Sequence, residues 1–231
     1  MTALSEEPRE VMIACKTLRT EIEHIAAQHG VERPIVWLES LLHNVTEKLE
    51  AGLQEALDAV TDADIVLLGY ANCGNTVQGL RTGDYELIVP RLDDCISLLF
   101  GSQRAREAYG QQNPAYFYTD GWMDEGHNMI DEYEHAVERY DEETARDIFG
   151  MMYEHYDTMA FLETGLYDID ALMNQLRFIA EMCEMEQRRA PATLSYVERL
   201  VIGPWDDDLF VHVPPHSQIP AQPFATPGSV L

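Results

Sequence analysis

The stretch Asp64-Ile65-Val66-Leu67-Leu68-Gly69 runs directly into Tyr70-Ala71-Asn72-Cys73-Gly74-Asn75. Its first half is a short apolar run, which is typical of a strand buried on both faces of a parallel sheet. The second half is a polar turn that carries a thiol. Because ligands bind beyond the carboxyl ends of such strands, this stretch predicts an α/β protein with a site at that edge of the sheet.

Similar apolar runs flank this stretch and alternate with amphipathic segments. Further strands are expected at 11–14, 34–38, 86–90, 115–118, 159–162 and 209–213. Helices are expected at 18–30, 45–60, 93–100, 169–188 and 193–202. This alternation predicts a Rossmann-like open, mostly parallel sheet flanked by helices.

The chain is expected to form one α/β domain over residues 10–213. A segment at about 120–157 is strongly acidic and predicts two helices that form an insertion or a cap over the sheet. Residues 1–9 are expected to be disordered, and the Pro-rich residues 214–231 are expected to form a tail or an arm that binds a partner.

The composition excludes several classes of partner. The 231 residues include 15 Lys and Arg against 41 Asp and Glu, a net charge of −26, which would repel nucleic acid. No apolar run approaches the roughly 20 residues of a membrane span, and the acidic start does not resemble an export signal. We therefore expect a cytoplasmic protein whose four cysteines are thiols or metal ligands. A homodimer is expected only because dimers are the commonest assembly of soluble proteins.

Polar and reactive side chains follow successive predicted strands, so a parallel sheet would gather them at one edge. Three thiols and an imidazole there would form a tetrahedral zinc site, with Cys15, Cys73 and Cys95 as ligands and His43 as the fourth. No CxxC motif occurs, and three cysteines favour zinc over an iron–sulfur cluster.

Other residues at this edge are given supporting roles. Asp93 and Asp94 would orient ligands or serve as acid and base, and Arg91 would hold an anionic group. The substrate-binding candidates are Thr17, Asn44, Asn72, Asn75, Trp122 and Glu163. Each has a structural explanation when taken alone, such as a helix N-terminal charge for the two aspartates or a buried apolar role for a cysteine. The clustering is what favours function.

Several short motifs together resemble one family. They are Ala14-Cys15-Lys16-Thr17-Leu18, His43-Asn44, Gly69 to Asn75, Pro90-Arg91-Leu92-Asp93-Asp94-Cys95-Ile96, Gly101-Ser102, Tyr118 to Trp122, Glu163-Thr164-Gly165 and Gly203-Pro204-Trp205-Asp206. The set resembles a prokaryotic family catalogued only as a domain of unknown function, over about residues 11–214. Its members are often encoded beside corrinoid proteins and methyltransferases of one-carbon metabolism. The resemblance implies a role near corrinoid-dependent methyl transfer, with a corrinoid protein or a methyltransferase as partner.

The leading hypothesis is a zinc–thiolate protein that acts in corrinoid-linked methyl transfer or one-carbon metabolism, as a metal-dependent methyl- or thiol-group transferase. One alternative is a non-catalytic accessory protein that binds a corrinoid protein or methyltransferase through its acidic helices and tail. Another is a metal-free enzyme in which Cys15 and Cys73 transfer protons on opposite sides of a small acid.

Overall fold

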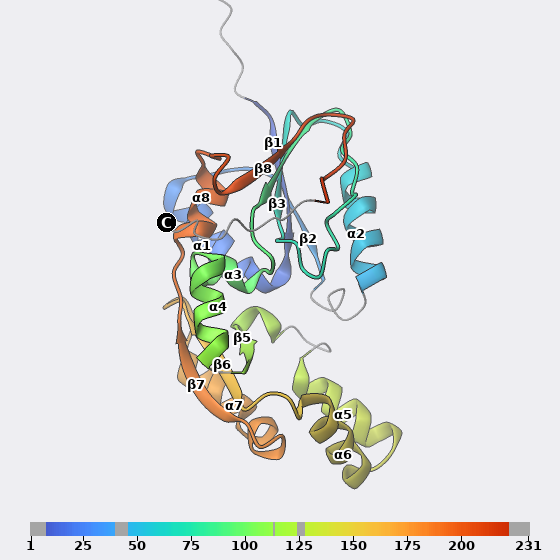
Figure 1. The fold of residues 1–231 in the computed structure, drawn as a ribbon, viewed down its shortest axis with the longest axis vertical. Coiled ribbons are helices and arrows are strands. Elements are labelled where there is room, and N and C mark those ends of the chain that lie inside the picture. Colours follow the sequence, from blue (N-terminus) through green and yellow to red (C-terminus); the bar gives the residue numbers. More distant parts are fainter. Residues whose placement is uncertain (1–7, 40–45, 113, 124–127, 222–231) are drawn as a thin grey trace, which may run out of the picture.

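The structure is a computed structural model that describes residues 8–39, 46–112, 114–123 and 128–221. It contains a five-stranded sheet and a three-stranded sheet, each flanked by helices (Figure 1). The prediction of an α/β fold with a mostly parallel sheet is confirmed. No helix in these ranges has the length and apolar character that crossing a membrane requires.

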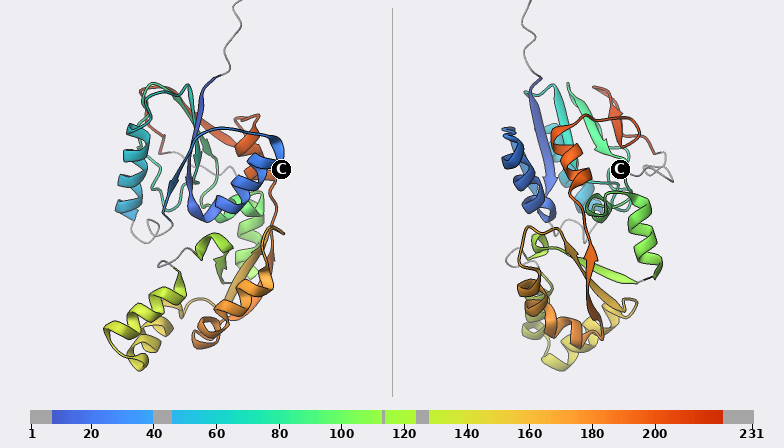
Figure 2. Two further views of the ribbon diagram at one scale, coloured as in Figure 1. Left: turned by 180° about the vertical axis from the view of Figure 1, so that it is seen from behind. Right: turned by 90° about the vertical axis from the view of Figure 1, so that its left-hand side faces the viewer.

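The five-stranded sheet holds four parallel strands and one antiparallel edge strand. In spatial order these are β2 (Ile35–Leu38), β1 (Glu10–Cys15), β3 (Ile65–Gly69), β4 (Glu86–Pro90) and the antiparallel β8 (Phe210–Val213). Helix α2 (Thr46–Asp58) lies on one face, with α1 (Arg19–His29) and α8 (Ser195–Ile202) on the other (Figure 2). The central strands are buried on both faces, which is why they are continuous apolar runs.

The strand order reverses between β1 and β3. From β1 the chain moves outward to β2, returns to β3 on the other side of β1 and continues to β4. The carboxyl ends of β1 and β3 are therefore the switch point at which ligands bind in such sheets. The two strands approach closely there, since a Cβ at Gly69 would lie 2.6 Å from the Cβ of Ala14.

The second sheet consists of the parallel strands β5 (Ala115–Tyr118), β6 (Thr158–Glu163) and β7 (Glu186–Pro191). The sequence predicted a helix over 169–188 at this point. Helix α7 (Ile169–Met182) instead ends earlier, and the chain turns at Glu184, which has φ +56°, into β7. Strand β7 lacks an apolar run because only Ala190 of its six residues is buried, so the sequence pattern gave no signal for it.

Short helices and turns connect the two sheets. They are the 3₁₀ turns η1 (Lys16–Leu18) and η3 (Asp120–Trp122) and the helices α3 (Ile96–Phe100), α4 (Gln103–Gln112), α5 (Met129–Arg139) and α6 (Glu142–Tyr153). The acidic helices α5 and α6 are inserted between β5 and β6 and pack with α7 on the second sheet (Figure 1). The side chain of Asn128 caps α5, and Asp141 caps α6.

The first residues after β8 pack against the loop before β4. The Gly79 amide donates to the Ile219 carbonyl and the Thr82 amide to the Ser217 carbonyl, each at 3.0 Å. The Ile219 amide in turn donates to the Leu80 carbonyl. Ile219 is buried. This part of the expected tail therefore belongs to the folded domain, while residues 222–231 and 1–7 lie outside the described residues.

Candidate functional site

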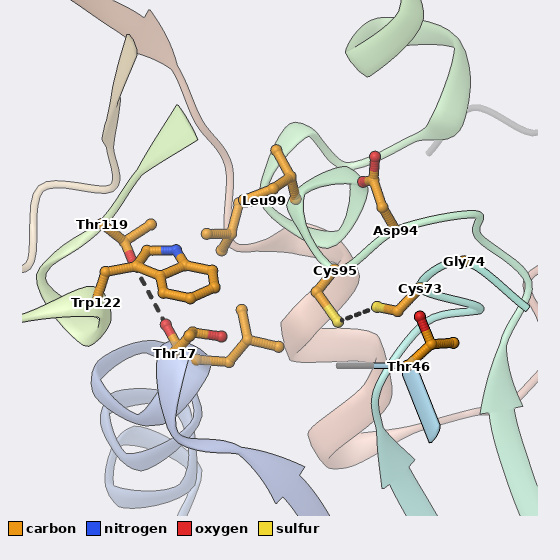
Figure 3. Close-up of a pocket in the computed structure, with 11 residues that line it drawn as sticks. Thr17, Thr46, Cys73, Gly74, Asp94, Cys95, Leu99, Thr119 and Trp122 are labelled. Carbon is orange, nitrogen blue, oxygen red and sulfur yellow. Dashed lines mark hydrogen bonds between the residues drawn. The ribbon is translucent and has the colours of Figure 1, made fainter. Parts of the chain in front are cut away.

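A pocket of about 320 Å³ lies beyond the carboxyl ends of β1, β3 and β4 (Figure 3). It is lined by Thr17, Leu18, Thr46, Cys73, Gly74, Asp94, Cys95, Ile96, Leu99, Thr119 and Trp122. One wall comes from the loops of the five-stranded sheet and the other from η3, which follows β5 of the second sheet. The pocket thus lies at the switch point and between the two sheets.

Two of the predicted ligands are in contact inside this pocket. The sulfur atoms of Cys73 and Cys95 lie 3.0 Å apart, the first in the loop after β3 and the second at the start of α3 (Figure 3). The two loops are tied together because the amides of Asn72 and Cys73 donate to the carbonyls of Leu92 and Asp93. Backbone hydrogen bonds between neighbouring loops therefore bring the two thiols together.

Cys15 lies behind this pair at the end of β1 and is fully buried. Its sulfur accepts a hydrogen bond of 3.0 Å from the hydroxyl of Thr17, and the hydroxyl of Tyr70 interacts with the same sulfur. The backbone amide of Ala71 similarly approaches the sulfur of Cys95 at 3.5 Å. Donors directed at sulfur are typical of the surroundings of thiolates that bind a metal.

Burial strongly affects the ionisation of these thiols. It raises the pKa of Cys15 to about 11, and the nearby Cys73 sulfur adds to that rise. The pKa of Cys95 is also raised, first by its hydrogen bond with Cys73 and then by burial. Without a cation in the site, Cys15 and Cys95 are therefore protonated at neutral pH.

The zinc site stays a prediction. Within the described residues no three His, Cys, Asp or Glu side chains are already placed to hold a metal ion. Two thiolates bound to one zinc ion would lie about 3.8 Å apart, so the sulfurs of Cys73 and Cys95 would have to move apart from their separation of 3.0 Å to bind the same ion. Cys15 is near enough for its charge to act on both other sulfurs, whereas His43, like Asn44, lies outside the described residues.

The loop that carries Cys73 is held by side-chain amides. Cys73, Gly74 and Asn75 have φ values of +39°, +72° and +71°, a run that side chains other than glycine rarely adopt. Asn72 donates to Asn75 over 2.9 Å, and Gln78 donates to both of their side-chain oxygens. Asn72 and Asn75, which were predicted to bind the substrate, thus use their side chains to stabilise the loop conformation.

Asp94 lines the pocket but is already engaged. One of its oxygens accepts from the amide and the hydroxyl of Ser97, each at 2.8 Å, and the other lies 3.3 Å from Nε of Arg106. Asp93 is exposed and contributes its backbone carbonyl to Cys73. Within the described residues the observed contacts of these aspartates are structural.

Two other predicted residues do not line the pocket. Arg91 donates to the carbonyls of Asp207 and Phe210, beside the antiparallel strand β8. Glu163 is exposed and its carboxylate pairs with Arg189 at 2.7 Å. The guanidinium of Arg91 is thus directed at β8 and not at the thiols.

Trp122 and Thr17 meet where η3 packs against η1. Figure 3 shows the Trp122 indole across the pocket from the two cysteines. Thr119 donates a hydrogen bond of 3.3 Å to the carbonyl of Thr17, and a Cβ at Gly121 would lie only 2.3 Å from that carbonyl oxygen. Glycine at this position is therefore what allows the close approach that forms the second wall.

Sequence reasoning missed several parts of the site. Tyr70 carries a weak signal, because it is a polar residue directly after a buried strand and next to the Asn-Cys-Gly turn. The remaining wall residues are Leu18, Thr46, Ile96 and Leu99. They are ordinary residues in local sequence, and only the packing of the two sheets makes them neighbours.

A family model described as "Protein of unknown function (DUF1638)" matches residues 37–201, more than half of the chain. The chain belongs to this family. The segment that matches DUF1638 includes Cys73, Cys95 and Trp122, whereas Cys15 and Thr17 precede it. No curated protein and no solved structure matches the chain.

Proposed function

We propose that this chain is a zinc–thiolate protein that acts in corrinoid-linked methyl transfer or one-carbon metabolism. Cys73, Cys95 and Cys15 would hold the metal, with His43 or a substrate atom in the fourth position. The observation that carries the proposal is the convergence of three thiols at the switch point of the sheet, with hydroxyl and amide donors directed at two of their sulfurs.

The chemistry of the donor set supports a soft divalent metal. Burying Cys15 and Cys95 costs little while they are protonated, but a protonated thiol is only a weak hydrogen-bond acceptor. A thiolate accepts hydrogen bonds more strongly than a thiol, so the donors directed at these sulfurs would stabilise thiolates. In a buried site, thiolates also need a metal cation to offset their charge. Sulfur ligands of this kind select zinc over hard cations.

A zinc ion bound by thiolates lowers the pKa of a thiol that binds beside it, and so supplies a nucleophile at neutral pH. The residues of the chain would position this nucleophile. Thr17 and Tyr70 hold the Cys15 sulfur, and the amide network around Asn75 fixes the loop of Cys73. The half-buried Cys73 faces the pocket through which a substrate would enter.

The corrinoid part of the proposal comes from the family resemblance. In the proposed step, the lone pair of a substrate thiolate forms a carbon–sulfur bond while the carbon–cobalt bond of a methylcorrinoid breaks. The electron pair of that bond stays on cobalt, and no further reactant is needed. A corrinoid protein or a methyltransferase would be the partner that presents the methyl group.

The two other hypotheses have less support. The metal-free mechanism needs Cys15 and Cys73 on opposite sides of a substrate, but Cys15 is fully buried and does not line the pocket. The accessory role uses the acidic helices α5 and α6, which lie on the second sheet. It predicts salt-sensitive binding to a corrinoid protein without turnover, so a turnover assay separates it from the enzyme.

Elemental analysis of protein purified without chelator or affinity metal tests the metal site. We expect about one zinc per chain, lost in Cys73→Ser and Cys95→Ser and retained in Cys183→Ser. Cys183 is the matched control, because it is a buried thiol in the second core, away from the pocket. Metal content that is the same in Cys73→Ser as in the wild type would refute the proposal.

The reaction is tested with methylcobalamin and 2-mercaptoethanol as probes. We expect the zinc-loaded chain to convert methylcobalamin to the demethylated corrinoid, followed by absorbance, with the methyl thioether as product. The Cys73→Ser variant should lose this activity and the Cys183→Ser variant should keep it. Metal bound without methyl transfer in this assay would favour the accessory role.

A further inference from the structure

We infer that the pocket takes a small, uncharged thiol or its methyl thioether, and admits neither an anionic substrate nor a corrin ring. This inference names the substrate class of the proposed function and rests on it. Three features of the pocket carry it, namely its volume, its apolar wall and the placement of charges around it.

The volume limits what can enter. About 320 Å³ is at the lower end of small-molecule pockets, and a corrin ring with its side chains is larger than this. The pocket is also closed on one side by η3, which the close contact of Gly121 with Thr17 holds in place. A corrinoid would therefore stay on its partner protein and reach the site from the mouth of the pocket.

Much of the pocket lining is apolar. It includes Leu18, Ile96 and Leu99, of which the last two lie on α3 beside Cys95, and the indole of Trp122, which Figure 3 shows across the pocket from the thiols. Contact with these groups favours an alkyl or methyl substituent and costs a charged group its hydration. The hydroxyl of Thr46, which is exposed at the rim, can supply a hydrogen bond suited to an uncharged polar group.

No Lys or Arg is among the residues that line the pocket, and the segments outside the described residues contain neither residue type. Two of the cations around the pocket form ion pairs. Arg106 lies beside Asp94, and Lys16 pairs with Glu39 at 2.5 Å. The net charge of −26 on the whole chain further disfavours the entry of an anion.

A pair of alkylating reagents of nearly equal size tests this on the metal-free chain. Iodoacetamide is neutral and iodoacetate is anionic, and both would modify Cys73, which peptide mass spectrometry quantifies. We expect the rate ratio of iodoacetamide to iodoacetate at Cys73 to be about tenfold greater in the folded chain than in the chain unfolded in urea. An equal ratio in both states would overturn the inference.

A variant that adds a positive charge at the pocket provides a second test. Thr46 is exposed at the rim, so Thr46→Lys adds a cation there without disturbing the core. We expect this variant to lower the iodoacetamide-to-iodoacetate rate ratio at Cys73 toward the ratio measured in the urea-unfolded chain. Gln111→Lys, an exposed change of the same charge on α4, should leave the ratio unchanged. Equal effects of the two variants would show that only the net charge matters and would refute the pocket argument.

The substrate itself is tested on the zinc-loaded chain with 2-mercaptoethanol and 2-mercaptoethanesulfonate. We expect methylation of the neutral thiol at least about tenfold faster than that of the sulfonate. Faster methylation of the sulfonate would overturn the inference but leave the proposed function intact. Absence of metal would overturn the proposed function, while the alkylation ratios, which need no metal, would still decide the character of the pocket.

Discussion

The sulfur atoms of Cys73 and Cys95 lie 3.0 Å apart, although 22 positions separate the two residues in the chain. Their strands β3 and β4 are parallel neighbours, so the loops that follow them leave the sheet side by side. The hydrogen bond from the Cys73 amide to the Asp93 carbonyl then fixes the approach. Four predictions follow from this contact and from the buried groups around it.

Mild oxidation should trap this pair. We expect diamide, which takes up the two electrons and two protons that the thiols lose, to form a Cys73–Cys95 disulfide in the metal-free chain within minutes. Prior loading with zinc should prevent it, because both thiolates are then bound. Peptide mapping under non-reducing conditions measures the product. A disulfide to Cys183, or equal oxidation with and without zinc, would contradict the prediction.

Zinc binding should depend steeply on pH. Burial raises the pKa of Cys15 to about 11 and contributes to the raised pKa of Cys95, so both thiols must lose a proton on binding the metal near neutral pH. We expect the affinity to rise by about 1,000-fold per pH unit between pH 6.5 and 7.5, since each of the three ligand thiols releases a proton. Competition with a chromophoric chelator measures this. Cys15→Ser should reduce the slope to about 100-fold per pH unit, and Cys183→Ser should keep the wild-type slope.

Glu21 should make the folded state less stable as the pH rises. It is fully buried on α1, and the effect of burial on its pKa outweighs that of the hydrogen bond with Thr164. Burial, with a contribution from the charge of Asp120, raises its pKa from 4.5 to about 7. The protonated form is therefore favoured in the folded state, and the stability that it gives is lost as the pH rises through 7.

The test compares Glu21→Gln with the wild type by urea unfolding at two pH values. We expect the variant to gain roughly 2 kcal/mol over the wild type on going from pH 5.5 to pH 8, because glutamine does not ionise. Glu23→Gln is the control on the same helix, since Glu23 is exposed and pairs with Arg19. The same pH dependence in Glu21→Gln as in the wild type would refute the assignment.

Gly121 should not tolerate a side chain. A Cβ there would lie 2.3 Å from the carbonyl oxygen of Thr17, a backbone atom that cannot move aside easily. We expect Gly121→Ala to lower the free energy of unfolding by about 2 kcal/mol or more and to open the pocket wall. Gly150→Ala in α6 is the matched control, because among the described residues no atom beyond its chain neighbours and the nearby backbone of its own helix lies within 4 Å of its Cβ position.

The control should change stability in the opposite direction. Alanine in the middle of a helix is favoured over glycine by about 1 kcal/mol, so Gly150→Ala should stabilise the chain. Thermal unfolding monitored by circular dichroism measures both variants. If Gly121→Ala were as stable as the wild type, the tight packing of η3 on η1 would not be required.

Much of the fold can be predicted from the sequence because its strands are local apolar runs. Strands β1, β3 and β4 are buried on both faces, so every residue in the run is apolar and the signal is strong. The same reasoning placed Cys73 and Cys95 at one sheet edge. Strand β7 was missed because it is half-exposed and carries Arg188 and Arg189, which gives it no apolar run.

The direction of side chains was harder to predict. Arg91 follows β4 just as Asp94 and Cys95 do, yet its guanidinium turns to the carbonyls beside β8. Strand β8 comes from more than 100 residues later in the chain and pairs antiparallel with β4. No local pattern around Arg91 carries information about that partner.

The sequence by itself determined the strands, the acidic character of the chain and the placement of its thiols after successive strands. These properties depend on neighbouring residues or on composition. Only the tertiary structure decided that the strands divide into two sheets and that η3 closes the pocket over the thiols. It also decided that Glu21 is buried beside Asp120. The physical reason is that such contacts join residues about 100 positions apart, and they are set by how the two cores pack and not by any local periodicity.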